Sequence, residues 1–250
     1  MKKFFRISGI LVLFLGVAAY IVYAMAFMPR HQDEACCSGI ILNISDDSNA
    51  DFISRQTIIN ILHEADLNPV GRKLKDIDLS KMEQLISGCQ YARSVECYKT
   101  SGGKIAIDVV QRTPVVFVLS DSLDGYYVDT DGLIIPNTAY AANIPVATGH
   151  ISKTYAKQQL RELGMFLLDN SFWDNQIEQI VVLSDSHGCE VVELIPRVGN
   201  QTIFLGTMDD FETKLKRLRT FYEDGLSQIG WNKYCRFNLQ YANQVLCEKK

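Results

Sequence analysis

Ser184-Asp185-Ser186-His187 brings a hydroxyl, a carboxylate and an imidazole together within four residues. Hydrolases use these groups as nucleophile, orienting acid and base, but the three must converge in space, and neighbours on one loop rarely do. Neither serine lies in a G-x-S-x-G turn. We therefore interpret His187-Gly188 as a hairpin turn between strands, and we predict no catalytic residues here.

A second group of oxygen-bearing side chains, Asp129-x-Asp131-Gly132, matches the start of a calcium-binding loop. The residues that follow, Leu133-Ile134-Ile135, carry no side-chain oxygen to complete the coordination. A tight turn between two strands is the better interpretation, because Asp and Gly favour such turns.

Metal binding by the cysteines is not predicted either. The seven cysteines contain no C-x-x-C pair, and the four histidines are scattered among them. An odd number cannot pair completely within one chain, so we expect mostly small buried residues with one or two bridges, of unassigned connectivity. No cofactor motif is identified. The cysteines are Cys36, Cys37, Cys89, Cys97, Cys189, Cys235 and Cys247.

The N-terminal segment Ile7–Met28 holds 22 residues without a charge, after a tail, residues 1–6, with three basic residues and no acid. A helix rises about 1.5 Å per residue, so this run spans a hydrocarbon layer of about 30 Å. The basic tail predicts a cytoplasmic N-terminus and an exported remainder. A cleaved secretory signal is the alternative, because Ala24-Met25-Ala26 fits a peptidase site, but signal cores usually run about 7 to 15 residues.

The charge of the exported part limits its partners. Beyond the predicted anchor, 29 acidic residues face 22 basic ones, a formal net charge of −7. This balance disfavours binding to nucleic acid or to anionic lipid. No repeat of about 20 to 50 residues is present, which disfavours solenoids and propellers.

Residues 39–113, after a linker at 29–38, predict a small domain with the order β-α-α-β-β. The expected elements are a strand Ile40–Ile44, a helix capped by Ser54, a helix with a capping box of Ser80 and Glu83, and strands Tyr91–Tyr98 and Lys104–Val110. Residues 114–250 predict a mostly antiparallel β domain with two helices, one over Thr154–Leu168 and one starting at Thr207, boxed with Asp210. The fold class is therefore α+β.

The C-terminal segment shows the clearest alternation. Its apolar residues fall on one face of a single predicted strand, and the intervening polar residues fall on the other. If this strand lies at a sheet edge, its unpaired amides and carbonyls can accept a partner strand. The apolar residues are Phe237, Leu239, Tyr241, Val245 and Cys247.

The order of elements and four short motifs resemble the FtsQ/DivIB cell-division family, with a POTRA domain followed by a β domain. The motifs are Gln111–Val115, Tyr126–Ile134 with its "VD-x-x-G" element, Ile144–Gly149 and Asn238–Val245. The resemblance implies a non-enzymatic divisome scaffold in the bacterial inner membrane, with most of the chain in the periplasm. It would link early division proteins to septal peptidoglycan synthesis by binding FtsB/FtsL-like bitopic proteins.

By the same resemblance, Tyr241 and Asn243 are the expected partner contacts, on a strand that also includes Phe237, Leu239 and Val245. The family carries an aromatic residue shortly after this motif, and Val245-Leu246-Cys247 offers none.

Two other classes of function are the alternatives to this scaffold. An exported enzyme that acts on envelope polymer, with an unrecognised catalytic group, is the alternative to a scaffold. An outer-membrane assembly factor also uses POTRA domains, but about 135 residues with two helices cannot supply its barrel.

Overall fold

The computed structural model describes residues 13–24, 35–45, 52–119, 125–137, 142–226, 230 and 233–249. The chain divides into two compact units, one of Met1–Ser45 with Ile53–Gln111 and the other of Asp46–Phe52 with Arg112–Lys250.

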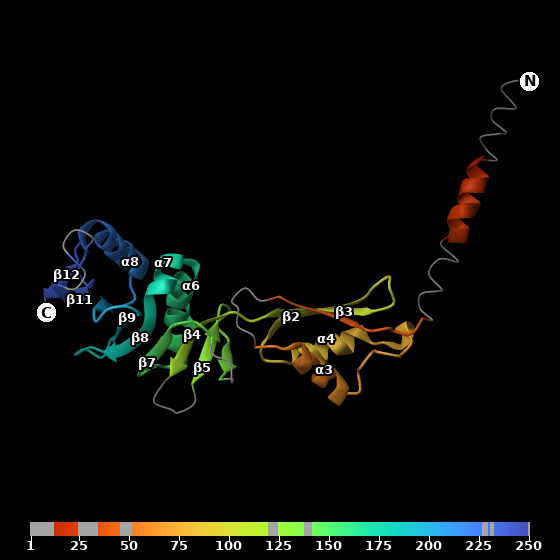
Figure 1. Cartoon of the computed structure of the whole chain (residues 1–250), viewed down its shortest axis with the longest axis horizontal. Helices are drawn as coiled ribbons and strands as arrows, with labels where there is room; N and C mark the ends of the chain where they lie inside the picture. Colours follow the sequence, from red (N-terminus) through yellow and green to blue (C-terminus); the bar gives the residue numbers. More distant parts are fainter. Residues whose placement is uncertain are drawn as a thin grey trace, which may run out of the picture. The chain divides into compact units, whose positions relative to one another are not determined.

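The first unit has the predicted β-α-α-β-β order (Figure 1). Its elements are β1 (Ile40–Ser45), α3 (Arg55–Glu64), a 3₁₀ turn η1 (Leu74–Asp76), α4 (Leu79–Ser87), β2 (Ala92–Lys99) and β3 (Ile105–Gln111). The sheet order is β1-β3-β2, with β1 parallel and β2 antiparallel to β3. The central strand β3 is the most apolar, and Ile105 and Ile107 are fully buried.

The two helices of this unit differ in how well their starts were predicted. Ser54 caps α3 as expected, because its hydroxyl accepts from Thr57 N at 3.1 Å. The capping box of Ser80 and Glu83 is wrong. Asp78 is the N-cap of α4, and the Glu83 carboxylate instead accepts from Cys97 N, at 2.7 Å. Glu83 lies beside β2 and bonds that strand instead of capping its own helix. The spacing of residues in the sequence cannot show such a contact.

The second unit is built on a nine-stranded sheet with the order β12-β11-β10-β9-β8-β7-β4-β5-β6. The strands are β4 (Pro114–Leu119), β5 (Tyr126–Asp129), β6 (Ile134–Pro136), β7 (Val146–Gly149), β8 (Ile177–Ser184), β9 (Glu190–Pro196), β10 (Thr202–Gly206), β11 (Tyr234–Asn238) and β12 (Leu246–Lys249). Five neighbouring pairs are antiparallel, and three are parallel: β4 with β7, β7 with β8, and β10 with β11. The sheet is therefore mixed. Helices connect the parallel pairs β7–β8 and β10–β11, whereas the chain between β4 and β7 passes through β5 and β6.

The helices of the second unit lie over one face of this sheet (Figure 1). They form a first run of α5 (Lys153–Tyr155), a π-helical stretch η2 (Ala156–Leu160) and α6 (Arg161–Asp169), then α7 (Ser171–Gln176), and later α8 (Phe211–Thr220) with a second π-helical stretch η3 (Phe221–Leu226). The prediction of two helices was nearly correct and missed α7. One core joins both layers, with Leu163, Leu215 and Ile180 fully buried.

The start of α8 differs from the predicted capping box. The helix begins at Phe211, four residues after Thr207, and Asp210 takes the N-cap position with φ of +50° and no side-chain cap. The Thr207 hydroxyl donates to Asp209 Oδ2 at 2.9 Å. The box is wrong because residues 207–210 form a turn of their own before the helix.

The turn at Asp129 and the hairpin turn at Asp185, which the sequence predicted, are both confirmed. Asp129 Oδ1 accepts from Asp131 N and Leu133 N at 3.0 and 2.7 Å. Asp185 Oδ1 accepts from His187 N and Cys189 N at 2.8 and 2.9 Å, so the carboxylate closes a hairpin and does not orient an imidazole ring.

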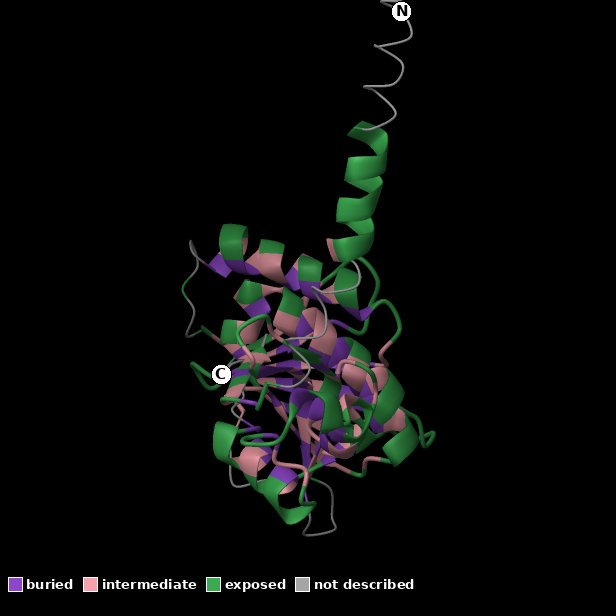
Figure 2. Cartoon of the chain, turned by 90° about the vertical axis from the view of Figure 1, so that its right-hand side faces the viewer, coloured by how far each residue is buried: buried purple, intermediate pink, exposed green. Residues whose placement is uncertain are grey.

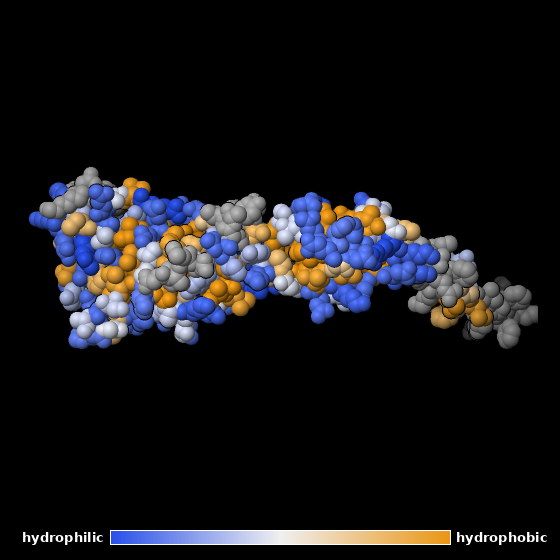
Figure 3. Space-filling model, turned by 90° about the horizontal axis from the view of Figure 1, so that it is seen from below, coloured by the Kyte–Doolittle hydropathy of each residue, from blue (hydrophilic) through white to orange (hydrophobic). Residues whose placement is uncertain are grey.

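Residues 13–24, within the predicted anchor, are helical, and the rest of Ile7–Met28 lies outside the described residues. Figure 2 shows this helix exposed along nearly its whole length, and Figure 3 shows apolar residues on it. In the part of the chain that the structure describes, no helix is both long enough and apolar enough to cross a bilayer.

The Asp129 turn generates a stability prediction. Asp129 is fully buried and pairs with Arg112 at 2.8 Å, whereas Asp131 lies 3.6 Å from the same guanidinium, with a side chain that is 38% exposed. Removing one member of a buried pair leaves an uncompensated charge, so Asp129→Ala is expected to lower the free energy of unfolding by about 3 kcal/mol. Asp131→Ala, the matched control, is expected to lose about 1 kcal/mol or less. Urea denaturation checks both values, and equal losses would contradict the assignment.

Candidate partner-binding edge

The C-terminal segment does not form the single strand that its alternation predicted. It runs as β11, reverses direction, and returns as β12 antiparallel to β11, with Phe237 opposite Cys247. The predicted strand over 236–247 is therefore wrong. We call residues 239–245, which connect the two strands, the closing turn.

Hydrogen bonds to β10 and α8 hold the chain at the point where it reverses. Leu239 N donates to Phe204 O at 2.8 Å, and Leu239 O accepts from Arg217 Nη2 at 3.1 Å, so α8 and β10 hold the start of the closing turn. Asn243 then adopts a left-handed backbone with φ of +60°. Asparagine tolerates this region better than most residues, and its presence was the sequence signal for a turn that alternation concealed.

The five predicted contact residues separate into two groups. Phe237 and Leu239 are buried at 1% and 0% exposure, and the ring of Phe237 packs 5.5 Å from that of Tyr222. These two residues belong to the core. Tyr241, which is 48% exposed, and Asn243 lie at the surface, and Val245 is half-buried. The surface residues of the closing turn therefore remain as the candidates for direct contact.

The strand β12 lies at one end of the nine-stranded sheet, so within the described residues no strand pairs with its outer side. The other end is β6, which contains only three residues and finishes at Pro136, a residue without an amide donor. On β12, Leu246 is 43% exposed, and Glu248 and Lys249 are exposed charges. Of the two edges, β12 is the better template for an added strand.

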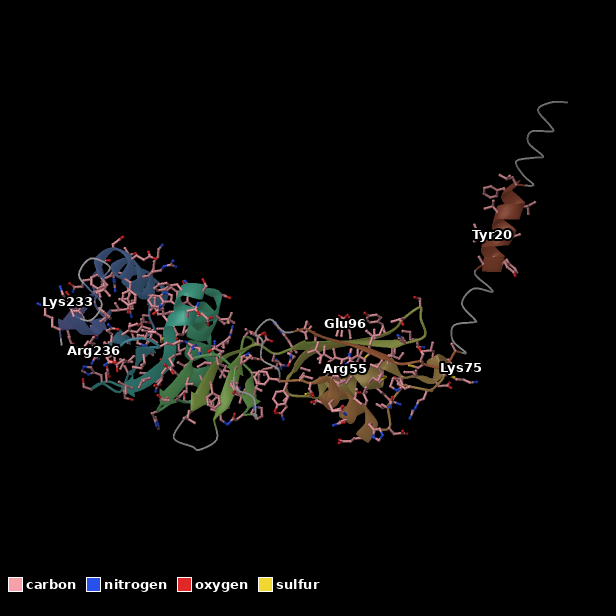
Figure 4. The ribbon with its side chains drawn as sticks, in the orientation of Figure 1. Tyr20, Arg55, Lys75, Glu96, Lys233 and Arg236 are labelled. Atoms are coloured by element: carbon pink, nitrogen blue, oxygen red, sulfur yellow. The ribbon has the colours of Figure 1, made fainter. Side chains whose placement is uncertain are left out.

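The environment of Arg236 is more constrained than a solvated surface position. Its guanidinium lies 3.4 Å from Glu193 and stacks 4.8 Å above the ring of Phe204. Figure 4 places Arg236 with Lys233 in the part of the unit that carries β11 and the C-terminus. Arg236 therefore joins three strands of the sheet, β9, β10 and β11.

Two pockets flank the closing turn. The first, which we call the turn pocket, has a volume of about 340 Å³ and lies between α8 and the closing turn; its walls include Thr207, Asp209, Lys214, Arg217, Tyr241 and Asn243. The second has about 510 Å³ and is lined by Phe221, Gly225 and Val245 among others. Arg217 and Asn243 line both pockets, so the two are adjacent. The alternation of residues 236–247 gave no indication of either pocket.

The titratable groups around this edge are tuned by burial. Desolvation lowers the pKa of Lys214, against the opposing effect of Asp209 and Asp210. Burial raises the pKa of the Cys247 thiol, which keeps it protonated and unreactive at neutral pH.

All seven cysteines are free thiols in the structure, so the expected bridges are not formed. Among the described residues, no three His, Cys, Asp or Glu side chains form a metal-binding group.

Both parts of the chain are similar to known protein families. Residues 113–248 match the family model described as FtsQ/DivIB, C-terminal related, and residues 35–110 match a POTRA-like domain. A solved structure, the major extracytoplasmic domain of the trans isomer of the cell division protein DivIB from Geobacillus stearothermophilus, is similar at 15% identity. The match covers 42% of this chain and 87% of that one, with a TM-score of 0.30. No curated protein matches the chain.

The left-handed residue of the closing turn can be tested by substitution. Glycine takes positive φ without steric cost, whereas a β-branched side chain does not. Asn243→Gly is therefore expected to change the free energy of unfolding by less than about 1 kcal/mol, and Asn243→Val to lower it by about 1 to 3 kcal/mol. Urea denaturation of the two variants, side by side, measures the difference. If valine is tolerated as well as glycine, the turn does not have this conformation in solution.

Proposed function

Because the chain belongs to the FtsQ/DivIB C-terminal-related family, we propose that it is a non-enzymatic, membrane-anchored scaffold of bacterial cell division. The observation that carries this proposal is the open edge of β12 beside an exposed turn. A partner segment would add a strand to β12 through main-chain hydrogen bonds, and side chains of the closing turn would supply specificity.

The chemistry of the edge supports this mode of binding. An edge strand presents amides and carbonyls that only water or another strand can satisfy. Phe237 and Leu239 anchor β11 in the core, and β11 holds the neighbouring β12 in register. Because β12 is already ordered before a partner arrives, binding carries no entropy cost for ordering it. Tyr241 presents a large amphipathic ring at the surface, a residue type that is enriched at binding hot spots.

We further propose that residues 7–28 anchor the chain in the bacterial inner membrane, with the N-terminus in the cytoplasm and residues 29–250 in the periplasm. Residues 13–24 support this placement, because they are helical and expose Leu13, Phe14 and Tyr20 at 71%, 78% and 72%. An apolar surface of this kind is stable in lipid and unfavourable in water.

The partners would be FtsB/FtsL-like bitopic division proteins, and through them the scaffold would connect early division proteins to septal peptidoglycan synthesis. Such partners carry their extracytoplasmic segments on the same face of the membrane. Co-anchoring raises the effective concentration of the two chains, so that a short strand pairing suffices for association.

Truncation after Val245 tests the role of β12 without removing Phe237 or Leu239 from the core. The shortened chain is expected to fold and to stay in the membrane fraction, but to lose co-purification of its partner from cross-linked cells. Deletion from Phe237 onward is a poorer test, because it also removes the buried side chains of Phe237 and Leu239 and leaves a cavity in the core. Retained partner recovery by a folded, truncated chain would refute binding at β12.

The exposed aromatic ring of the closing turn can be tested against a matched ring elsewhere. Tyr241→Ala is expected to weaken partner recovery at least about tenfold, in line with truncation of an aromatic hot spot. Tyr98→Ala, in the first unit, removes a ring of similar exposure, 44% against 48%, and should leave recovery unchanged. Quantitative immunoprecipitation from membranes gives both values. An equal effect of the two changes would place the contact elsewhere.

A further inference from the structure

The helix α8 is a basic element on an acidic protein. Its ten residues include Lys214, Lys216, Arg217 and Arg219, with Glu212 as the one acid, whereas the whole chain has a formal net charge of −4. Arg219 is already engaged, because it pairs with Glu223 at 2.8 Å and lies 4.8 Å from the ring of Phe172. The other cations of the helix are therefore the ones to consider.

Lys214 and Arg217 both line the turn pocket, and neither forms an ion pair within the described residues. The Lys214 ammonium donates to Thr207 O at 2.8 Å, and Arg217 donates to Leu239 O at 3.1 Å. An ammonium has three N–H donors and a guanidinium has five, so most of these donors have no acceptor among the described residues. The Nε atom of Arg217 is buried and has no acceptor in the described part of the chain.

Two acids stand at the rim of the same pocket, and they do not neutralise these cations at close range. Asp209 Oδ2 accepts from the Thr207 hydroxyl. Asp210 is held at positive φ at the start of α8. Both raise the pKa of Lys214 only through longer-range attraction, and the desolvation that lowers this pKa is the larger effect. The pocket thus has partly desolvated cations that lack a carboxylate within ion-pair distance.

Backbone conformation points to the same place. Of the three non-glycine residues with positive φ in the described chain, Asp210 and Asn243 both line the turn pocket. Sparsely populated backbone conformations concentrate at binding and switching sites, where the surrounding structure holds them in place.

We infer that the turn pocket receives an aspartate or glutamate side chain from the same partner segment that adds a strand to β12. This inference rests on the proposed function and names the chemistry of the partner. A segment that pairs with Leu246 and continues past Val245 reaches Asn243, which borders the turn pocket, within about three residues at about 3.3 Å each. Its carboxylate would then accept from Lys214 and Arg217, which adds a charge-assisted contact to the main-chain pairing.

The test begins with capture through the edge itself. A photoreactive residue at position 246 of the full-length chain identifies the partner in living cells. That partner, purified at full length and labelled, is then the probe titrated against full-length variants in detergent at 50 and 300 mM NaCl. Lys214→Gln is the test variant, because glutamine keeps an N–H donor for Thr207 O. Lys216→Gln is the matched control, on the same helix but outside the turn pocket.

At 50 mM NaCl, Lys214→Gln is expected to raise Kd about fivefold or more and Lys216→Gln less than twofold, with the difference shrinking at 300 mM. Lys214→Glu is expected to bind more weakly still, and replacement of the partner's contacting acid by lysine should restore binding. Equal Kd values for the two glutamine variants, with capture at position 246 intact, would overturn the turn-pocket inference and leave strand addition standing. Absence of capture at position 246 would overturn both. Thermal unfolding confirms that each variant is folded.

Discussion

The burial of Phe237 and Leu239 beneath α8 and η3 is the constraint on which the C-terminal edge depends. Their side chains are 1% and 0% exposed, and Phe237 packs against the rings of Tyr222 and Phe221 at 5.5 and 6.1 Å. Full burial of two such side chains stabilises β11 by about 3 to 6 kcal/mol relative to an exposed strand. With β11 fixed between β10 and β12, the last strand becomes the sheet edge.

An edge of this kind provides geometry but little selectivity, because any extended segment can satisfy its amides and carbonyls. Selectivity must come from side chains near the strand. In the proposed binding mode the closing turn would supply them, since it exposes Tyr241, places Asn243 between two pockets, and lies beside the cations of α8. One short hairpin and the helix behind it would thus carry both main-chain pairing and side-chain recognition.

Several elements could be predicted from residue order alone because local rules decide them. The cap Ser54, the turn at Asp129 and the hairpin at Asp185 each depend on contacts within four residues. The capping boxes at Ser80 and Thr207 failed because a nearby group offered a competing partner or turn. Glu83 bonds the Cys97 amide of β2 instead, and that contact spans 14 residues of chain.

The sequence by itself determined the α+β class, the order of elements in the first unit, the acidic balance of residues 29–250 and the resemblance to a cell-division family. These properties follow from composition, periodicity and short motifs. Only the tertiary structure decided that residues 236–247 form a hairpin, that β12 is the open edge, and that Lys214 and Arg217 meet the closing turn. Alternation is identical for one strand and for two antiparallel strands, and the contacts that distinguish them join residues far apart in the chain.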